Sequence, residues 1–338
     1  MRFKKQKLPV TGYVSPVVLF PVLLVLLALG LVNGDESAKK TVKQTNRDDG
    51  LPKVKHMIDT HIHLYDPTRE KGVPWPPEDD QILYKPHLPK EFRQVSQKAG
   101  VTGVVIVEAS GRIEDNRWVL DLVKGDDYFI GLVGNVDPYR EDFGKQIRKI
   151  AKDKRLVGIR ARVDDKKIDY RDPKVLKSFK VLSKRNLALD ILMNGEGYET
   201  VTEISRLAKK LPELRIVVNH VLGYDIDGKL PPSQWIKAVK ELGTHQNVYV
   251  KVSGLYQRCV AQPATQDLKH YRELLDILWD CFGEDRLIYG SNWPCTKKSG
   301  DYTSFAKLVN EYFSAKGQPA CEKYFWQNAT RAYQLGLK

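Results

Sequence analysis

Short apolar runs alternate with charged, amphipathic segments along most of this 338-residue chain. The apolar runs span Met57–His63, Gly103–Glu108, Phe129–Asn135, Leu156–Arg160, Ala188–Met193, Arg215–His220, Val248–Val252 and Leu287–Gly290. They are too apolar for a sheet with one face in water. They suit strands that are buried on both faces, as strands of parallel sheets are.

The segments between these runs predict helices, because their apolar residues recur with helical spacing. They cover about 88–99, 114–126, 139–153, 172–185, 197–211, 232–243, 267–282 and 301–315. Eight strand–helix units in about 280 residues favour a closed (β/α)₈ TIM barrel over an open doubly wound sheet. No Gly-x-Gly-x-x-Gly or P-loop motif follows the first strand, which excludes the usual nucleotide-binding site.

The first 34 residues have the pattern of a targeting segment. Four basic residues between positions 2 and 7 precede an apolar run at 14–32, as in a secretory signal peptide. The run is also nearly long enough to cross a bilayer. We therefore expect residues 1–34 to be a signal peptide or a membrane anchor, residues 35–56 a polar linker, and residues 57–338 one catalytic domain. The domain is expected to be periplasmic, secreted or anchored facing away from the cytoplasm.

The chain is basic, with a net charge of +13. Residues 1–55 carry ten Lys and Arg against four Asp and Glu, so the surplus on the body is modest. A modest, dispersed surplus favours anionic small molecules. The body has no basic stripe interleaved with aromatic residues, and we expect no nucleic-acid partner. Oligomeric state is left open.

Polar residues gather where the predicted strands end, which is where barrels of this type place their active sites. They are Asp59, His61, His63, Glu108, Asn135, Asp137, Arg160, Arg162, Asn219, His220, Lys251, Ser253, Ser291 and Asn292. Each polar group buried without a partner costs about 1–3 kcal/mol. A core that served packing alone would not hold so many, so these ends predict a functional site.

Three histidines are the candidate catalytic centre. His61 and His63 are two residues apart on one strand, so their side chains point to the same face. His220 ends the sixth strand and faces the same mouth. Together they are predicted to bind a divalent metal such as zinc, or to hydrogen-bond a substrate carbonyl without one. The alternative is that they are ordinary buried histidines with satisfied hydrogen bonds.

Other side chains are candidates for substrate binding. Arg160 and Arg162 share one face and could clamp a carboxylate through their rigid forks; facing outward, they would only pack against helices. Ser253 could donate a hydrogen bond, or belong to a turn. Three aromatic residues are candidate pocket walls, or else core fillers: Trp75, Tyr256 and Trp293.

Several motifs occur in an order that resembles the amidohydrolase-related family. They are IDTHIHLYDP at 58–67, WPP at 75–77, EDNRWVLDL at 114–122, VGIRAR at 157–162, VVNH at 217–220, NVYVKVSGL at 247–255, FGEDRLIYGSNWP at 282–294 and NATRAYQL at 328–335. The resemblance covers roughly residues 57–336 and is strongest to the branch of sugar-lactone hydrolases and pyrone-dicarboxylate lactonases. It implies a TIM barrel that hydrolyses or decarboxylates small organic acids, often with a divalent metal, although some lactonases work without one.

One position departs from this family pattern. The motif Gly-Ser-Asp-Trp-Pro usually supplies an Asp as general base or metal ligand, and this chain has Asn292 in its place. An amide cannot accept a proton near neutral pH. Either another carboxylate such as Glu108, Asp137 or Asp66 is the base, or the barrel no longer hydrolyses its ligand.

The expected function is hydrolysis of a small, anionic organic-acid ester or lactone. The alternatives are a ligand-binding barrel without catalysis and a decarboxylase-type lyase. Four cysteines lie in the last quarter of the chain, at 259, 281, 295 and 321. In an exported protein they could form up to two disulfides; free thiols are the equal alternative.

Overall fold

A computed structural model describes residues 50–160, 168–195 and 197–337. The predicted targeting segment, almost all of the predicted linker and Arg162 lie outside these residues. Within them, no helix is long and apolar enough to cross a membrane.

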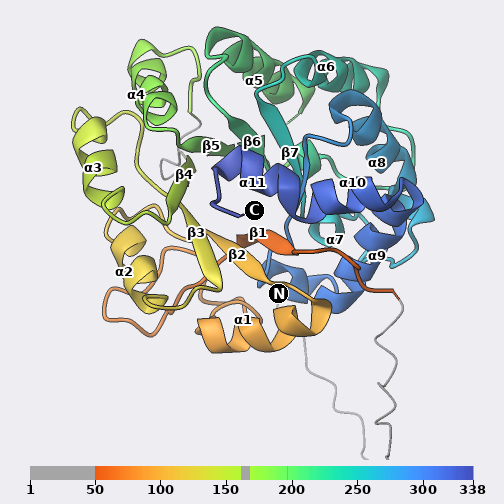
Figure 1. The fold of residues 1–338 in the computed structure, drawn as a ribbon, viewed down its shortest axis with the longest axis horizontal. Coiled ribbons are helices and arrows are strands. Elements are labelled where there is room, and N and C mark those ends of the chain that lie inside the picture. Colours follow the sequence, from red (N-terminus) through yellow and green to blue (C-terminus); the bar gives the residue numbers. More distant parts are fainter. Residues whose placement is uncertain (1–49, 161–167, 196, 338) are drawn as a thin grey trace, which may run out of the picture. The chain divides into compact units, whose positions relative to one another are not determined.

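Eight parallel strands form one sheet in sequence order from β1 to β8. The strands are β1 (Ile58–Ile62), β2 (Gly103–Val107), β3 (Phe129–Gly134), β4 (Leu156–Arg160), β5 (Ala188–Ile191), β6 (Ile216–Val218), β7 (Val248–Val252) and β8 (Leu287–Tyr289). Each falls inside one of the predicted apolar runs. Figure 1 shows them as a ring enclosed by helices, so the predicted (β/α)₈ architecture is confirmed.

The ring is closed between β8 and β1 by bonds at and beyond the strand ends. The hydroxyl of Thr60 donates to the Tyr289 carbonyl at 2.5 Å. The Asn292 amide then donates to the His61 carbonyl at 2.8 Å, and the His63 amide to the Trp293 carbonyl at 2.8 Å. The segment after β8 is therefore fixed against the histidine pair that ends β1.

Helices cover the outside of the ring. They are α1 (Pro89–Ser96), α2 (Asp115–Leu122), α3 (Phe143–Ile150), α4 (Pro173–Lys184), α5 (Tyr198–Lys210), α6 (Ser233–Gly243), α8 (Lys269–Phe282) and α9 (Tyr302–Ala315). Asp172 caps α4 and Asp301 caps α9, each accepting a backbone N–H bond of the first turn, as N-cap residues do. Each helix lies in a segment where the sequence predicted one.

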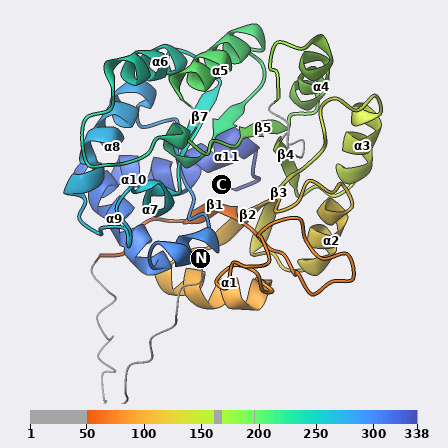
Figure 2. The ribbon, with the colours of Figure 1, turned by 180° about the vertical axis from the view of Figure 1, so that it is seen from behind.

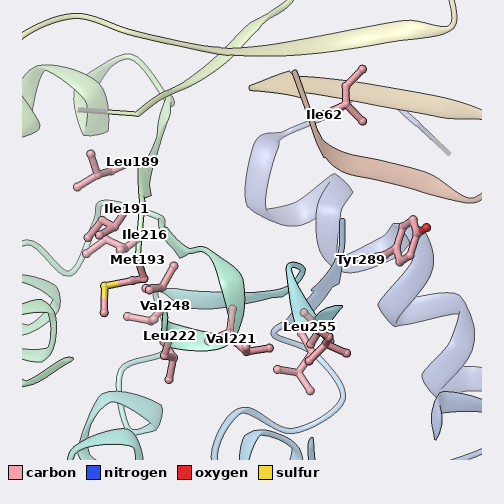
Figure 3. Packing of buried hydrophobic residues seen from close by; sticks show 14 of the residues in the cluster. Ile62, Leu189, Ile191, Met193, Ile216, Val221, Leu222, Val248, Leu255 and Tyr289 are labelled. Atoms are coloured by element: carbon pink, nitrogen blue, oxygen red, sulfur yellow. The ribbon is translucent and has the colours of Figure 1, made fainter. Parts of the chain in front are cut away.

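Two apolar layers hold the barrel together. The outer layer fills the space between strands and helices. Figure 3 shows a section of it around β5, β6 and β7, with Ile191, Ile216 and Val248. The inner layer lies inside the ring and includes Ile58 and Val217, which pack with residues from the C-terminal end of the chain.

The C-terminal segment closes the barrel at the N-terminal ends of the strands. It contains α10 (Gln318–Glu322), a π-helical turn (Lys323–Gln327) and α11 (Asn328–Tyr333). Figure 1 shows α11 across the middle of the strand ring, and Figure 2 shows it beyond the strands from the other side. The sequence predicted none of these elements, nor the short α7 (Leu255–Arg258).

Asn328 ties this plug to β8. Its side-chain amide is fully buried and donates to the carbonyls of Glu284 and Leu287, both at 2.8 Å. We expect Asn328→Ala to lower the free energy of unfolding by about 1–3 kcal/mol, because two carbonyls lose their buried donor. Urea unfolding measures the change. Asn310 is half-buried, donates to the Gly50 carbonyl and accepts from the exposed Ser314 hydroxyl. Asn310→Ala should therefore cost below about 1 kcal/mol. Equal losses would contradict this role for Asn328.

Candidate active site

A cavity of about 210 Å³ opens at the C-terminal ends of the strands, opposite the C-terminal plug. It has room for one small molecule. Its lining residues are His63, Trp75, Glu108, Ala109, Arg160, Leu192, Asn194, His220, Asn292 and Cys295. Six of them, His63, Trp75, Glu108, Arg160, His220 and Asn292, are site residues that the sequence predicted.

His63 reaches the cavity because β1 is irregular at its end. The pairing register with β2 shifts between Asp59 and Ile62, and the Asp59 carboxylate accepts the His61 amide at 3.0 Å. The His63 Nδ1 atom then faces the carbonyls of Val107 and Glu108 at 3.1 and 3.0 Å. A carbonyl only accepts, so Nδ1 carries the proton and Nε2 is left as an acceptor.

His61 lies behind the cavity wall rather than in it. Its side chain is fully buried, and its Nε2 atom faces a guanidinium nitrogen of Arg160 at 3.0 Å. A guanidinium only donates, so Nε2 accepts and the proton sits on Nδ1. The His61 ring centroid is 5.1 Å from that of His63 and 4.5 Å from that of His220. The structure therefore brings the three predicted histidines together.

His220 begins a turn of four residues with positive φ, which runs from His220 to Gly223 with φ of 54°, 47°, 60° and 69°. Left-handed backbone costs roughly 1–2 kcal/mol per non-glycine residue, and the β-branched Val221 makes this turn unusual. The His220 backbone amide and Nδ1 atom both face the Ser253 hydroxyl, at 3.2 and 3.1 Å. Ser253 is not among the residues that line the cavity, and its hydroxyl contacts His220 instead.

Burial keeps all three imidazoles neutral. It lowers the pKa of His63 to about 3 and holds the pKa values of His61 and His220 well below the usual range. The positive charge of Arg160 acts in the same direction on each ring. The centre therefore presents neutral nitrogen acceptors, not imidazolium cations, near neutral pH.

Glu108 and Arg160 bring opposite charges to the cavity. The Glu108 Oε1 atom lies 3.8 Å from NH1 of Arg160, and both side chains are nearly fully buried. The NH2 group of Arg160 also donates to the Asn219 side-chain oxygen. Asn292 lies across the same cavity with φ of 59°, a left-handed conformation that Asn tolerates better than most residues.

The remaining predicted site residues lie elsewhere. Trp75 does line the cavity, with its ring 5.6 Å from that of His63. Tyr256 and Trp293 are core residues, each 1% exposed, which agrees with their alternative prediction as core fillers. Their rings pack against α9 and α1. Asp137 instead accepts the Tyr139 amide in a turn away from the cavity.

Sequence reasoning missed three polar or reactive groups. Asn194 and Cys295 line the cavity, and Asp190 is buried beneath it with an ion pair to Lys251. Asn194 lies three residues after the end of β5, so its position could have marked it as a candidate site residue. Asp190 lies inside an apolar run, and the sequence has no feature that marks it as part of the site. All four cysteines are free thiols, which answers the question of disulfides left open by the sequence.

The three histidines, as placed, do not fit a three-histidine metal site. Zinc requires nitrogen lone pairs that converge at about 2.0–2.1 Å on one point. Here the acceptor atom of His61 faces the cationic Arg160. Among the described residues, no three His, Cys, Asp or Glu side chains are placed to hold a metal ion.

The chain is similar to known proteins over most of its length. Residues 58–335 match the family model described as amidohydrolase. An L-fucono-1,5-lactonase of Burkholderia ambifaria is 29% identical over 276 residues, covering 80% of this chain and 90% of that protein. An L-rhamnono-gamma-lactonase of Scheffersomyces stipitis is 23% identical over 333 residues, covering 82% and 98%.

A solved amidohydrolase structure from Burkholderia multivorans has the same fold. It matches with a TM-score of 0.75 at 20% identity, over 83% of this chain and 99% of that one. A second crystal form of the same protein, with bound zinc, has a TM-score of 0.73 at 21% identity and the same coverage.

The low pKa of His63 predicts a pH dependence of stability. An unfolded histidine titrates near 6.5, so between pH 6.5 and 3 the unfolded chain binds a proton that folded His63 does not. The free energy of unfolding should therefore fall as pH falls below 6.5, by up to about 1.4 kcal/mol per pH unit for this group. Urea unfolding of wild type and His63→Gln between pH 7 and 5 measures the slopes. We expect a shallower slope in the variant; identical slopes would show that buried His63 becomes protonated.

Proposed function

The chain belongs to the amidohydrolase family, and we propose that it is a lactonase that opens the cyclic ester of a sugar acid. One observation carries the proposal: a carboxylate and a guanidinium, Glu108 and Arg160, face one small cavity beside neutral imidazoles. Two curated relatives are named as lactonases of the sugar acids fuconate and rhamnonate. These names favour hydrolysis over the decarboxylase alternative.

Glu108 is the general base in this proposal. It is the one carboxylate among the residues that line the described part of the cavity, and Asn292 cannot accept a proton. Glu108 removes a proton from water as the water oxygen attacks the lactone carbonyl carbon. The ring C–O bond then breaks, and Glu108 returns the proton to the departing ring oxygen. The products are the open-chain hydroxy acid and the unchanged enzyme.

Arg160 stabilises the charge that develops during this attack. Its guanidinium is permanently protonated and lies in a nearly water-free wall of the cavity, where a fixed cation acts more strongly than in bulk water. His63, Asn194 and Asn292 also line the cavity, and in this proposal their polar side chains face the hydroxyl groups of a bound sugar lactone. Trp75 covers the cavity beside His63.

The arrangement favours an uncharged lactone, in contrast to the anionic substrate expected from the sequence. The donors of Arg160 are already directed at Asn219, His61 and Glu108. Among the described lining residues it is the only Arg or Lys. A substrate carboxylate would have to displace one of these protein partners, whereas neutral hydroxyl groups would not.

Replacing the proposed base tests the mechanism. We expect Glu108→Gln to lower kcat for a sugar-acid 1,5-lactone by about 10²–10⁴-fold with little change in KM, because general base catalysis is lost and shape is kept. A pH-stat assay, which records the acid released, measures both constants. Asn292→Asp is the paired variant and should not exceed wild type. If Asn292→Asp alone turned an inactive barrel into an active one, the wild type would be a ligand-binding protein that has lost its base.

Metal content tests the histidine centre separately. The predicted zinc at His61, His63 and His220 is supported by the zinc-bound structural relative and opposed by Arg160 at the acceptor nitrogen of His61. We expect well below one metal ion per chain by elemental analysis of protein purified without chelators. About one zinc, manganese or iron per chain, absent from a His61→Ala/His63→Ala double variant, would overturn this expectation and assign the metal to these histidines.

A further inference from the structure

A buried polar network lies inside the barrel between the C-terminal plug and the active site. At its lower end the Tyr333 hydroxyl of α11 donates to Oδ1 of Asp190 at 2.7 Å. The other carboxylate oxygen accepts the Lys251 ammonium at 2.7 Å, and Lys251 also donates to the Thr60 carbonyl at 2.8 Å. Tyr333, Asp190 and Lys251 are each at most 1% exposed, so water does not compete for these bonds.

Asp190 sets the orientation of Asn219, the next residue towards the site. The Asn219 side-chain nitrogen donates to Oδ2 of Asp190 at 3.2 Å. An ionised carboxylate only accepts, so the amide nitrogen must face Asp190 and the amide oxygen must face away. That oxygen accepts from the guanidinium of Arg160. With the amide reversed, two donors would face each other in a buried space.

Arg160 joins the network to the reacting groups. Its NH2 group faces Nε2 of His61 at 3.0 Å, and its NH1 group lies 3.8 Å from Glu108. The network thus joins two buried ion pairs, Lys251 with Asp190 and Arg160 with Glu108. Asn219 lies between the two pairs. Its side-chain nitrogen donates to Asp190 and its side-chain oxygen accepts from Arg160, so it links the carboxylate to the guanidinium.

Stability alone is a weak reason for this arrangement. Buried ion pairs lose much of their mutual attraction to desolvation, and well-packed apolar residues are often as stabilising. Burial lowers the pKa of Lys251 to about 8 although Asp190 raises it, which shows how strongly the interior opposes the charge. A role in orienting the active site accounts for charged residues where apolar ones would pack equally well.

We propose that Tyr333, Asp190 and Lys251 are positioning residues, which act through Asn219 to hold Arg160 in the orientation that catalysis requires. The C-terminal helix therefore supports chemistry at the opposite end of the barrel. The kinetic test of this inference rests on the proposed lactonase function. The spectroscopic test rests only on the contacts of Arg160.

The test compares two tyrosine variants that each lose one hydroxyl. Tyr333→Phe removes the bond to the fully buried Asp190. Tyr312→Phe removes a bond of the same length, 2.7 Å, to Asp276, which lies on α8 outside the cavity and has a side chain that is 44% exposed. Both tyrosines are 1% exposed, which makes the second variant a matched control. We expect Tyr333→Phe to lower kcat about tenfold with KM within about twofold, on the scale of one buried hydrogen bond. Tyr312→Phe should leave both constants unchanged.

The second readout does not depend on turnover. The guanidinium ¹⁵N resonances of Arg160, identified by their absence in Arg160→Lys, report whether the group is held. We expect them to shift or broaden in Tyr333→Phe and to stay unchanged in Tyr312→Phe. If Tyr333→Phe does not fold, Asp190→Asn replaces it, because an amide there no longer dictates the orientation of Asn219. Shifted Arg160 signals in a protein without lactonase activity would support the network while the proposed function fails.

Normal kcat together with unchanged Arg160 signals in Tyr333→Phe would overturn the inference. Equal losses of activity in both tyrosine variants would also overturn it, because they would show a general effect on stability.

Discussion

The site depends on how one buried guanidinium is compensated. Arg160 cannot lose its proton, and its side chain is almost fully buried at the end of β4. A charge in such a place must be paired and hydrogen-bonded. Asn219, His61 and Glu108 meet that demand. Arg160 fixes the orientation of the Asn219 amide and determines which nitrogen of His61 carries the proton. It also lies beside the Glu108 carboxylate, so one cation arranges all three groups around the cavity.

The backbone near the site adopts left-handed conformations that are unfavourable for non-glycine residues. His220 is held at the cavity by a left-handed turn that its neighbours stabilise through Ser253. Gly290, just after β8, has no room for a side chain, because a Cβ atom there would lie 2.8 Å from the Cβ of His61. The end of β8 therefore lies close against the end of β1, where the His61 ring centroid is 5.1 Å from that of His63 and 4.5 Å from that of His220.

Position at a strand end did not by itself decide which of the predicted side chains reach the cavity. Glu108, Arg160 and Asn292 follow or end apolar strands, and all three reach the cavity. Tyr256 and Trp293 follow strands as well, yet their large rings pack into the core. Sequence spacing locates a residue along the barrel axis, but it does not tell whether a ring turns inward to the cavity or outward to a helix.

The sequence by itself determined the eight strand–helix units, the end of the barrel that carries the site and the missing carboxylate at Asn292. The strand–helix units follow from local periodicity, which the chain displays wherever its side chains alternate between core and surface. The position of the site follows from where the strands of such barrels end, and the missing carboxylate follows from the resemblance to the family motif Gly-Ser-Asp-Trp-Pro. Only the tertiary structure decided that His61 contacts Arg160, that Ser253 supports His220 and that Tyr333 reaches Asp190 across 143 residues of sequence. These contacts join segments that are far apart in the sequence and that come together only when the barrel closes. A local sequence pattern does not show which of their side chains will be in contact.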